Sequence, residues 1–215
     1  TKYLIQTVKK NKMLSDVHIR LIISRGIKST PYQDPSFTIS KPTIVIIPEY
    51  KKPDEKLYKK GLILKTVKTI RGPKNVQDPV LNTLSKLNCI LACIEAKKNN
   101  ADEALMHDIN GNIATNNSTH FFFIKDNKVY TSTGNYCVKG ITRKNVIDIC
   151  KSNKIRIYQK NFKLKDVMKA DEAFVTGTFA NIIPVKKINN KKFSIKKSNL
   201  TFIIRNLYLE KINNY

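Results

Sequence analysis

Two β-hairpins in direct succession, at residues 104–115 and 121–132, constrain the fold of this chain more than any other feature. The first, ALMHDINGNIAT, turns at Asn110-Gly111, and the second, FFFIKDNKVYTS, turns at Asp126-Asn127. These residues tolerate the positive φ angles of tight hairpin turns, and Asn-Gly is the sharper signal for a type I′ turn. Strands bounded in this way predict a mixed or antiparallel sheet.

Two helices are expected to flank this hairpin region. Within residues 83–98, four apolar residues from Leu84 to Ile94 recur every three or four positions, which is typical of one buried helical face. Residues 140–155 indicate a second helix, with Thr142 as a plausible N-cap.

The remaining segments predict short strands and turns. Residues 17–25 and 43–48 read as strands, the second closed by Pro48, and residues 62–70 read as a third. The turn-rich stretch 71–79 looks like a linker. Further elements are expected at 155–162 (strand), 164–169 (short helix), 170–185 (apolar runs around a turn) and 200–211 (amphipathic segment).

The predicted fold class is therefore α/β (α+β), in two parts. Residues 1–71 are assigned to a small α/β domain, and residues 72–215 to a larger domain. The chain starts at Thr1, and its first residues read as part of a strand, so we expect that an N-terminal part of a longer protein is missing.

The net charge of +24 is the largest compositional anomaly. Lys supplies 34 of the 40 basic residues and is spread along the whole chain, which indicates a codon bias that fills solvated faces with Lys. Nucleic-acid recognition relies on Arg and on aromatic residues between the basic ones. Nucleic-acid binding is therefore disfavoured as the main function, although weak attraction to acidic surfaces follows from the charge.

The cysteines and histidines indicate no metal site. The four Cys residues contain no C-x-x-C pair, and His18, His107 and His120 have no helpful spacing. Four reduced, mostly buried thiols suit a cytoplasmic protein. No apolar run approaches the roughly 18–20 residues that a membrane span needs.

Two glycine-containing turns are candidate anion sites. Gly140-Ile141-Thr142 precedes a helix, where amide N–H groups and the helix dipole both favour an anion. Thr176-Gly177-Thr178 follows a strand and offers amides and hydroxyls at one place. Most turns of either kind only cap a helix or reverse the chain, so neither one alone identifies a site.

Taken with their surroundings, the two turns resemble the fold-type IV pyridoxal-phosphate aminotransferases. The resemblance is carried in order by ADEALMHDINGNIA, NNSTHFFFIKDNKVYT, KGITRKNVIDIC and ADEAFVTGTFANIIPV. HIR at residues 18–20 and the TGT-x-A turn are most similar to the branched-chain type. The resemblance implies a barrel-like cofactor domain, pyridoxal 5'-phosphate, amino acid and 2-oxo acid substrates, and a homodimer.

The resemblance also implies roles for single residues. Gly140, Ile141, Thr142 and Thr178 correspond to the family's cradle for the cofactor phosphate. The implied substrate-binding residues are Phe179 and Ala180, whose amides would hold the substrate carboxylate, and Arg20 and Arg25. Arg20 and Arg25 lie five residues apart, so a regular strand points them to opposite faces, and Arg20 is favoured as the inward one.

Two residues that the family's chemistry needs are replaced here. The family lysine that carries the cofactor falls on Asn82, and the family glutamate that faces the pyridine nitrogen falls on Thr115. Lys86, four residues after Asn82, is the available catalytic amine, and its alternative interpretation is an ordinary surface lysine.

Three hypotheses follow. The chain is an aminotransferase with a displaced lysine, a catalytically inactive relative that keeps the fold with or without the cofactor, or a basic nucleic-acid-binding protein. A branched-chain-type aminotransferase is the favoured one.

Overall fold

The computed structural model describes residues 1–214. Contacts within the chain divide it into two compact units, Thr1–Pro53 and Asp54–Tyr215. The boundary predicted at 71/72 therefore lies inside the second unit.

The first unit is a two-stranded antiparallel sheet with one helix. β1 (Val17–Ile23) pairs with β2 (Ile44–Tyr50), α1 spans Lys2–Lys10, and a short 3-10 turn spans Pro35–Phe37. The start of the chain is thus helical, and the strand expected there was wrong. Pro48 lies within β2 opposite Ile19, rather than closing the strand, because both strands of a two-stranded sheet are edges that tolerate a missing N–H.

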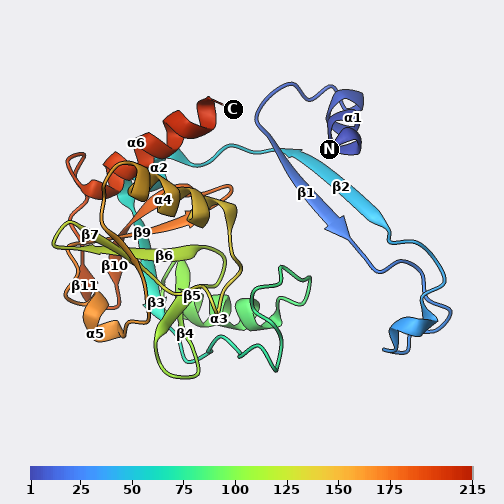
Figure 1. Cartoon of the computed structure of the whole chain (residues 1–215), viewed down its shortest axis with the longest axis horizontal. Helices are drawn as coiled ribbons and strands as arrows, with labels where there is room; N and C mark the ends of the chain where they lie inside the picture. Colours follow the sequence, from blue (N-terminus) through green and yellow to red (C-terminus); the bar gives the residue numbers. More distant parts are fainter. Residues whose placement is uncertain (215) are drawn as a thin grey trace. The chain divides into compact units, whose positions relative to one another are not determined.

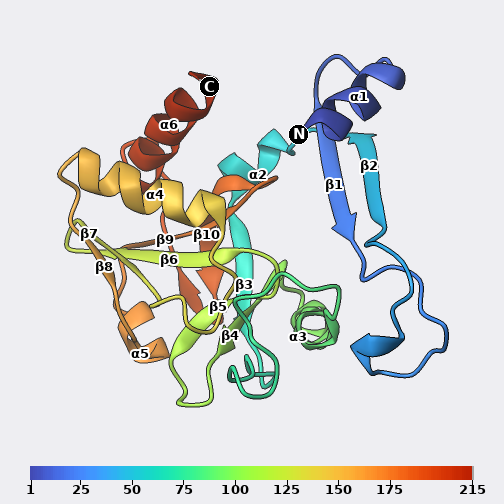
Figure 2. The same cartoon turned by 45° about the vertical axis from the view of Figure 1, so that its right-hand side comes forward.

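The second unit is built on a curled sheet that has nine strands among the described residues (Figures 1 and 2). The strand order is β5-β4-β3-β10-β9-β6-β7-β8, and β11 pairs with β10. The pairs β3–β4, β3–β10 and β7–β8 are parallel and the others antiparallel, so the predicted mixed sheet is confirmed. The strands are β3 (Leu62–Thr66), β4 (Glu103–His107), β5 (Ile113–Asn116), β6 (His120–Lys125), β7 (Lys128–Thr131), β8 (Ile157–Gln159), β9 (Glu172–Gly177), β10 (Asn181–Ile188) and β11 (Lys191–Lys192).

Five helices accompany the sheet within the part of the chain that the structure describes. They are α2 (Glu55–Lys60), α3 (Leu87–Lys98), α4 (Ile141–Ser152), α5 (Leu164–Val167) and α6 (Leu200–Asn213). The helix predicted over 83–98 begins four residues later, because residues 83–86 are irregular. No helix of the described chain is both long and apolar enough to cross a membrane.

The FFFI run of β6 explains why this sheet is covered on both faces. Phe121 and Phe123 join the core enclosed by the curled sheet, while Phe122 and Ile124 join a second core beneath α4 and α6. This alternation follows from the two-residue period of a strand. Phe122 stacks on Phe174 of β9, with ring centroids 4.9 Å apart and an interplanar angle of 6°.

The two hairpins form as predicted, with their turn types reversed. Asp126 and Asn127 both have positive φ, at 50° and 55°, so the second hairpin carries the type I′ turn. In the first hairpin, five residues separate β4 from β5, and Asp108 Oδ1 accepts bonds from the amides of Asn110 and Asn112. The Asp108 side chain therefore organises that loop, and Asn110-Gly111 is only part of it.

Candidate functional site

The first turn of α4 is an uncapped helix start. Gly140 is its N-cap, and no side chain of residues 1–214 caps the leading amides. Thr142, predicted as the N-cap, lies inside the first turn and is buried, while Ile141 is 75% exposed. Because the first amides of a helix have no partner within it, this end attracts an anion.

The imidazole of His120 supports this helix start. A Cβ atom added to Gly140 would lie 2.5 Å from His120 Cε1, so only glycine fits at this position without displacing the ring. His120 Nε2 also hydrogen-bonds the carbonyl oxygen of Val138, two residues before Gly140. The backbone leading into α4 is therefore held against this ring.

The second predicted turn begins beside the same histidine. His120 of β6 lies opposite Thr176 of β9 in the antiparallel register. β9 ends at Gly177, residues 178–180 form the turn, and Asn181 opens β10 with φ of 53°. The two predicted anion turns thus border one residue, His120, which sequence reasoning had set aside as a histidine without helpful spacing.

Two buried polar atoms near these turns lack a partner within the described chain. Thr176 Oγ1 is one, and the Thr176 residue is fully buried. Arg143 Nε in the first turn of α4 is the other, although Arg143 Nη2 donates to the carbonyl oxygen of Ser132 at 2.6 Å. Buried polar atoms are normally satisfied, so these two are available to a polar ligand.

Burial lowers the pKa of His120, and the nearby Arg143 and Arg71 guanidinium groups lower it further, against the raising effect of its backbone hydrogen bonds. The ring is therefore neutral at neutral pH. Burial raises the pKa of the neighbouring Cys137 thiol. The histidine and the cysteine beside the helix start are thus uncharged, and the cations there are Arg71, Lys139 and Arg143.

Arg71 joins the start of α3 to the loop that leads into α4. Its Nε donates to the carbonyl oxygen of Tyr136 at 3.1 Å, and its Nη1 contacts Asn88 Oδ1 at 3.2 Å and Cys89 Sγ at 3.1 Å. Arg71 falls in the stretch that the sequence marked as a linker, so no pattern distinguished it.

Lys86 and Asn82 lie just before α3 and contact each other directly. Lys86 Nζ donates to Asn82 Oδ1 at 2.7 Å, and Lys86 is half-buried whereas Asn82 is exposed. Both residues precede the helix, so the four-residue spacing does not place them on one helical face. The amine nevertheless lies at the side chain of residue 82, as the four-residue spacing suggested.

Thr115 belongs to a buried polar network. Its Oγ1 donates to the carbonyl oxygen of Thr119, and Thr119 Oγ1 in turn donates to Glu103 Oε2 at 2.6 Å. Ser118 Oγ also donates to Glu103, at 2.5 Å. Burial raises the pKa of Glu103, against the lowering effect of these hydroxyls. The carboxylate of this region thus comes from β4 and not from position 115.

The other predicted substrate-binding residues divide between the two units. Phe179 and Ala180 are half-buried in the β9–β10 turn, where Tyr58 Oη donates to the carbonyl oxygen of Ala180 at 3.4 Å. Arg20 lies in β1 and Arg25 follows it, both exposed and both in the first unit. Their roles stay predictions.

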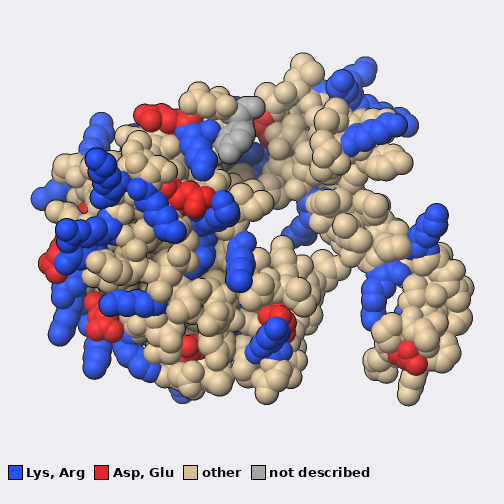
Figure 3. All heavy atoms as spheres, viewed as in Figure 1, with Lys and Arg blue, Asp and Glu red and all other residues tan. Residues whose placement is uncertain are grey.

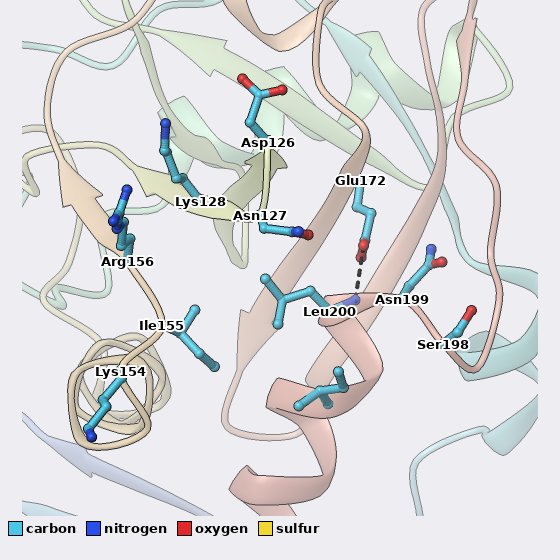
Figure 4. A pocket seen from close by; sticks show the side chains of 11 residues that line it. Asp126, Asn127, Lys128, Lys154, Ile155, Arg156, Glu172, Ser198, Asn199 and Leu200 are labelled. Atoms are coloured by element: carbon cyan, nitrogen blue, oxygen red, sulfur yellow. Dashed lines mark hydrogen bonds between the residues drawn. The ribbon is translucent and has the colours of Figure 1, made fainter.

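The hollow in Figure 4 lies elsewhere. It measures about 560 Å³ and lies between the β6–β7 turn, the segment after α4 and the start of α6. Glu172 accepts the amides of Leu200 and Thr201 there, both at 2.9 Å, so the start of α6 is already capped by a carboxylate. The start of α6 therefore does not offer a second anion site.

Comparison with known proteins identifies one family. The amino-transferase class IV family model matches residues 1–188. The branched-chain-amino-acid aminotransferase-like protein 2 of Arabidopsis thaliana is 33% identical over 188 residues, which is 86% of this chain and 33% of that protein. A putative branched-chain-amino-acid aminotransferase of Methanocaldococcus jannaschii is 33% identical over 194 residues, covering 90% and 66%.

A solved structure also shares this architecture. A T.th. branched-chain amino acid aminotransferase complexed with N-(5'-phosphopyridoxyl)-L-glutamate superposes with a TM-score of 0.88 at 26% identity, covering 98% of this chain and 69% of that one. The chain thus spans about a third of the Arabidopsis relative and about two thirds of the others.

Proposed function

The chain belongs to the amino-transferase class IV family, and from this we propose that it transfers an amino group between an amino acid of the branched-chain type and a 2-oxo acid, using pyridoxal 5'-phosphate. The observation that carries the proposal is the meeting of two candidate anion-binding turns at His120, one of them an uncapped helix start.

The residues present fit the phosphate of such a cofactor. The uncapped amides at Ile141 and Thr142 offer hydrogen bonds and the positive end of the α4 dipole. Thr176 Oγ1 is a buried hydroxyl without a partner in the described chain, and Thr178 follows it in the second turn. When bound, the cofactor supplies the carbonyl that takes up the amino group and the ring that delocalises the resulting charge.

We assign the amine of the site to Lys86, whose Nζ lies 2.7 Å from Asn82 Oδ1. In this assignment Asn82 orients the amine by accepting its hydrogen bond. Thr115 already donates its hydroxyl proton to Thr119, so towards the ring it offers only an acceptor. It would therefore accept a hydrogen bond from a protonated ring nitrogen but would not stabilise that proton by charge.

The substrate carboxylate is assigned to the amides of Phe179 and Ala180, with Arg20 and Arg25 as further substrate-binding residues. Tyr58 helps to hold the turn through Ala180, and Arg205 lies 4.0 Å from the centroid of the Tyr58 ring. A homodimer in the cytoplasm completes the proposal. The alternative of an inactive relative predicts a normally folded chain that binds the cofactor without attachment or does not bind it at all.

The test begins with the purified chain incubated with pyridoxal 5'-phosphate, reduced with borohydride and mapped by peptide mass spectrometry. A pyridoxyl group on Lys86, lost in Lys86→Arg, supports the assignment, and Lys139→Arg is the matched control because Lys139 is exposed beside Gly140. Attachment to a different lysine contradicts the role of Lys86 alone.

Amino transfer is measured separately, with a branched-chain amino acid and 2-oxoglutarate as the probe pair. Transfer above the rate of free cofactor, reduced by Lys86→Arg, is expected. Bound cofactor with neither attachment nor transfer would overturn the proposed enzyme and favour the inactive relative.

A further inference from the structure

A second surface of the chain combines stacked aromatic rings with positive charge. It lies on β6, β7 and β8, at the end of the sheet path, where Figure 3 shows many Lys and Arg side chains over this part of the second unit. We refer to this surface as the β8 edge. It consists of Phe123, Lys125, Lys128, Tyr130, Arg156, Tyr158 and Lys160.

The aromatic residues form a continuous row across three strands. Phe123 pairs with Tyr130, and Tyr130 pairs with Tyr158 in the strand register. Their ring centroids are 4.9 Å and 5.3 Å apart, with interplanar angles of 11° and 21°, so the rings stack face to face. Phe123 is buried in the enclosed core, and the row becomes more exposed towards Tyr158, which is 42% exposed.

This row has no further ring at its outer end among the described residues. β8 is the last strand of the sheet path there, so no described strand follows Tyr158 to cover it. A flat aromatic ligand placed against Tyr158 would extend the stack that Phe123, Tyr130 and Tyr158 already form. Base–aromatic stacking is tolerant of sequence, because every base offers such a face.

Positive charge surrounds the row. Lys125 pairs with Lys128, and the register places Lys128 beside Arg156. Figure 4 shows Lys128 and Arg156 pointing to the same side, away from α6. Lys160 Nζ lies 5.2 Å from the Tyr130 ring centroid and 5.9 Å from that of Tyr158. None of these four cations forms an ion pair with a carboxylate in the part of the chain that the structure describes.

We propose that the β8 edge binds single-stranded nucleic acid, with one base stacked on the outer face of Tyr158 and the adjoining phosphates on Lys128, Arg156 and Lys160. A single strand is the partner that fits both the aromatic row and the basic side chains. Its bases are free to stack on a ring, and its backbone carries a negative charge at every nucleotide. A duplex presents the charge without a free base face, and an anionic membrane presents no flat ring.

This activity is separate from the proposed amino transfer. Gln159 lies between Tyr158 and Lys160, and its Oε1 accepts a hydrogen bond from Arg143 of α4 at 3.2 Å. Because side chains alternate along a strand, Gln159 faces α4, whereas Tyr158 and Lys160 face the opposite side. The charge of +24 alone did not identify this surface, since the basic and aromatic residues meet only through strand pairing.

The test measures binding of a fluorescein-labelled oligothymidylate of about 15 nucleotides, by anisotropy at several salt concentrations. Tyr158→Ala is expected to weaken binding at least about fivefold, because stacking on one aromatic ring contributes on that scale. Tyr50→Ala is the matched control, since Tyr50 is 65% exposed in the first unit. Lys160→Gln should reduce the salt slope by roughly 0.7, with Lys151→Gln as its control.

Tyr158→Trp keeps the protein testable if the alanine variant is unstable. The natural chain has no Trp, so the introduced side chain would be the only indole in the variant. The variant should still bind oligothymidylate, and binding should quench the fluorescence of this indole. Absence of binding at about 0.1 M salt would overturn the proposal. Equal affinity for the matching duplex, or vesicles of anionic lipid that bind with the same dependence on Tyr158, would overturn it as well.

Discussion

His120 lies so close beneath Gly140 that a single added methyl group on the glycine would come within 2.5 Å of the imidazole. The same histidine pairs with Thr176, the first residue of the second candidate turn. One residue of β6 therefore sets the separation between the helix start and the β9–β10 turn. Any ligand phosphate held by both turns depends on this contact.

Gly140→Ala should displace the His120 ring and disturb the start of α4. Overpacking of this kind costs about 1–3 kcal/mol, which corresponds to a decrease in Tm of roughly 2–10 °C for a chain of this size. Thermal unfolding followed by circular dichroism measures the change. Gly72→Ala is the control, because no described atom lies within 4 Å of a Cβ atom there, and it should leave Tm nearly unchanged.

The same Gly140→Ala variant should bind pyridoxal 5'-phosphate more weakly, and His120→Ala in the same chain should restore part of the binding by making room. Equilibrium dialysis provides the measurement. Unchanged affinity in Gly140→Ala would show that the α4 start does not hold the phosphate.

His120 should make the protein less stable in mild acid. Burial lowers its folded-state pKa, so as the pH falls the unfolded chain takes up the proton first, and folding free energy is lost from the unfolded pKa down through the folded one. His107, whose pKa burial also lowers, adds a similar contribution. Urea unfolding at about pH 7 and about pH 5, on either side of the ordinary His pKa, should show a smaller loss in His120→Asn than in the natural chain. The same urea unfolding measurements on His107→Asn give the contribution of His107 separately.

Glu103 should show the opposite dependence on pH. Because its folded-state pKa is raised, mainly by burial, it favours folding below its unfolded pKa, and this contribution disappears as the pH rises through the folded value. Glu103→Gln should flatten that part of the stability profile. Glu103→Ala leaves the hydroxyls of Ser118 and Thr119 without their acceptor and should cost about 1–3 kcal/mol. Equal effects of the two substitutions would contradict the network.

Phe122→Ala should destabilise the second unit by about 3–5 kcal/mol, because it removes a fully buried ring that stacks on Phe174 between the sheet and α4. Ile203→Ala is the matched control, since Ile203 is 48% exposed on α6. Its effect should stay within about 1 kcal/mol. Denaturant unfolding of both variants gives the comparison.

Local patterns predicted most of the elements correctly. The two hairpins, the strands of the first unit and the short helix α5 depend on residues close in sequence, so periodicity and turn chemistry identified them, whereas α6 was predicted only as an amphipathic segment. The error at Thr142 has a tertiary cause. Thr142 resembles an N-cap, but the preceding Gly140 is pressed against His120 and occupies that position instead.

What the sequence determined by itself was the family, the mixed sheet and the two glycine-containing turns, while the replacement of the family's lysine and glutamate at residues 82 and 115 stays a prediction. Tertiary structure alone decided that His120 joins those turns, that Arg71 connects α3 to the loop before α4, and that tyrosines of β7 and β8 stack beside basic side chains. The physical reason is the separation along the sequence over which each interaction acts. Periodicity and turn propensity act within a few residues, whereas these contacts join segments 17 to 65 residues apart, whose proximity depends on strand register and sheet curvature.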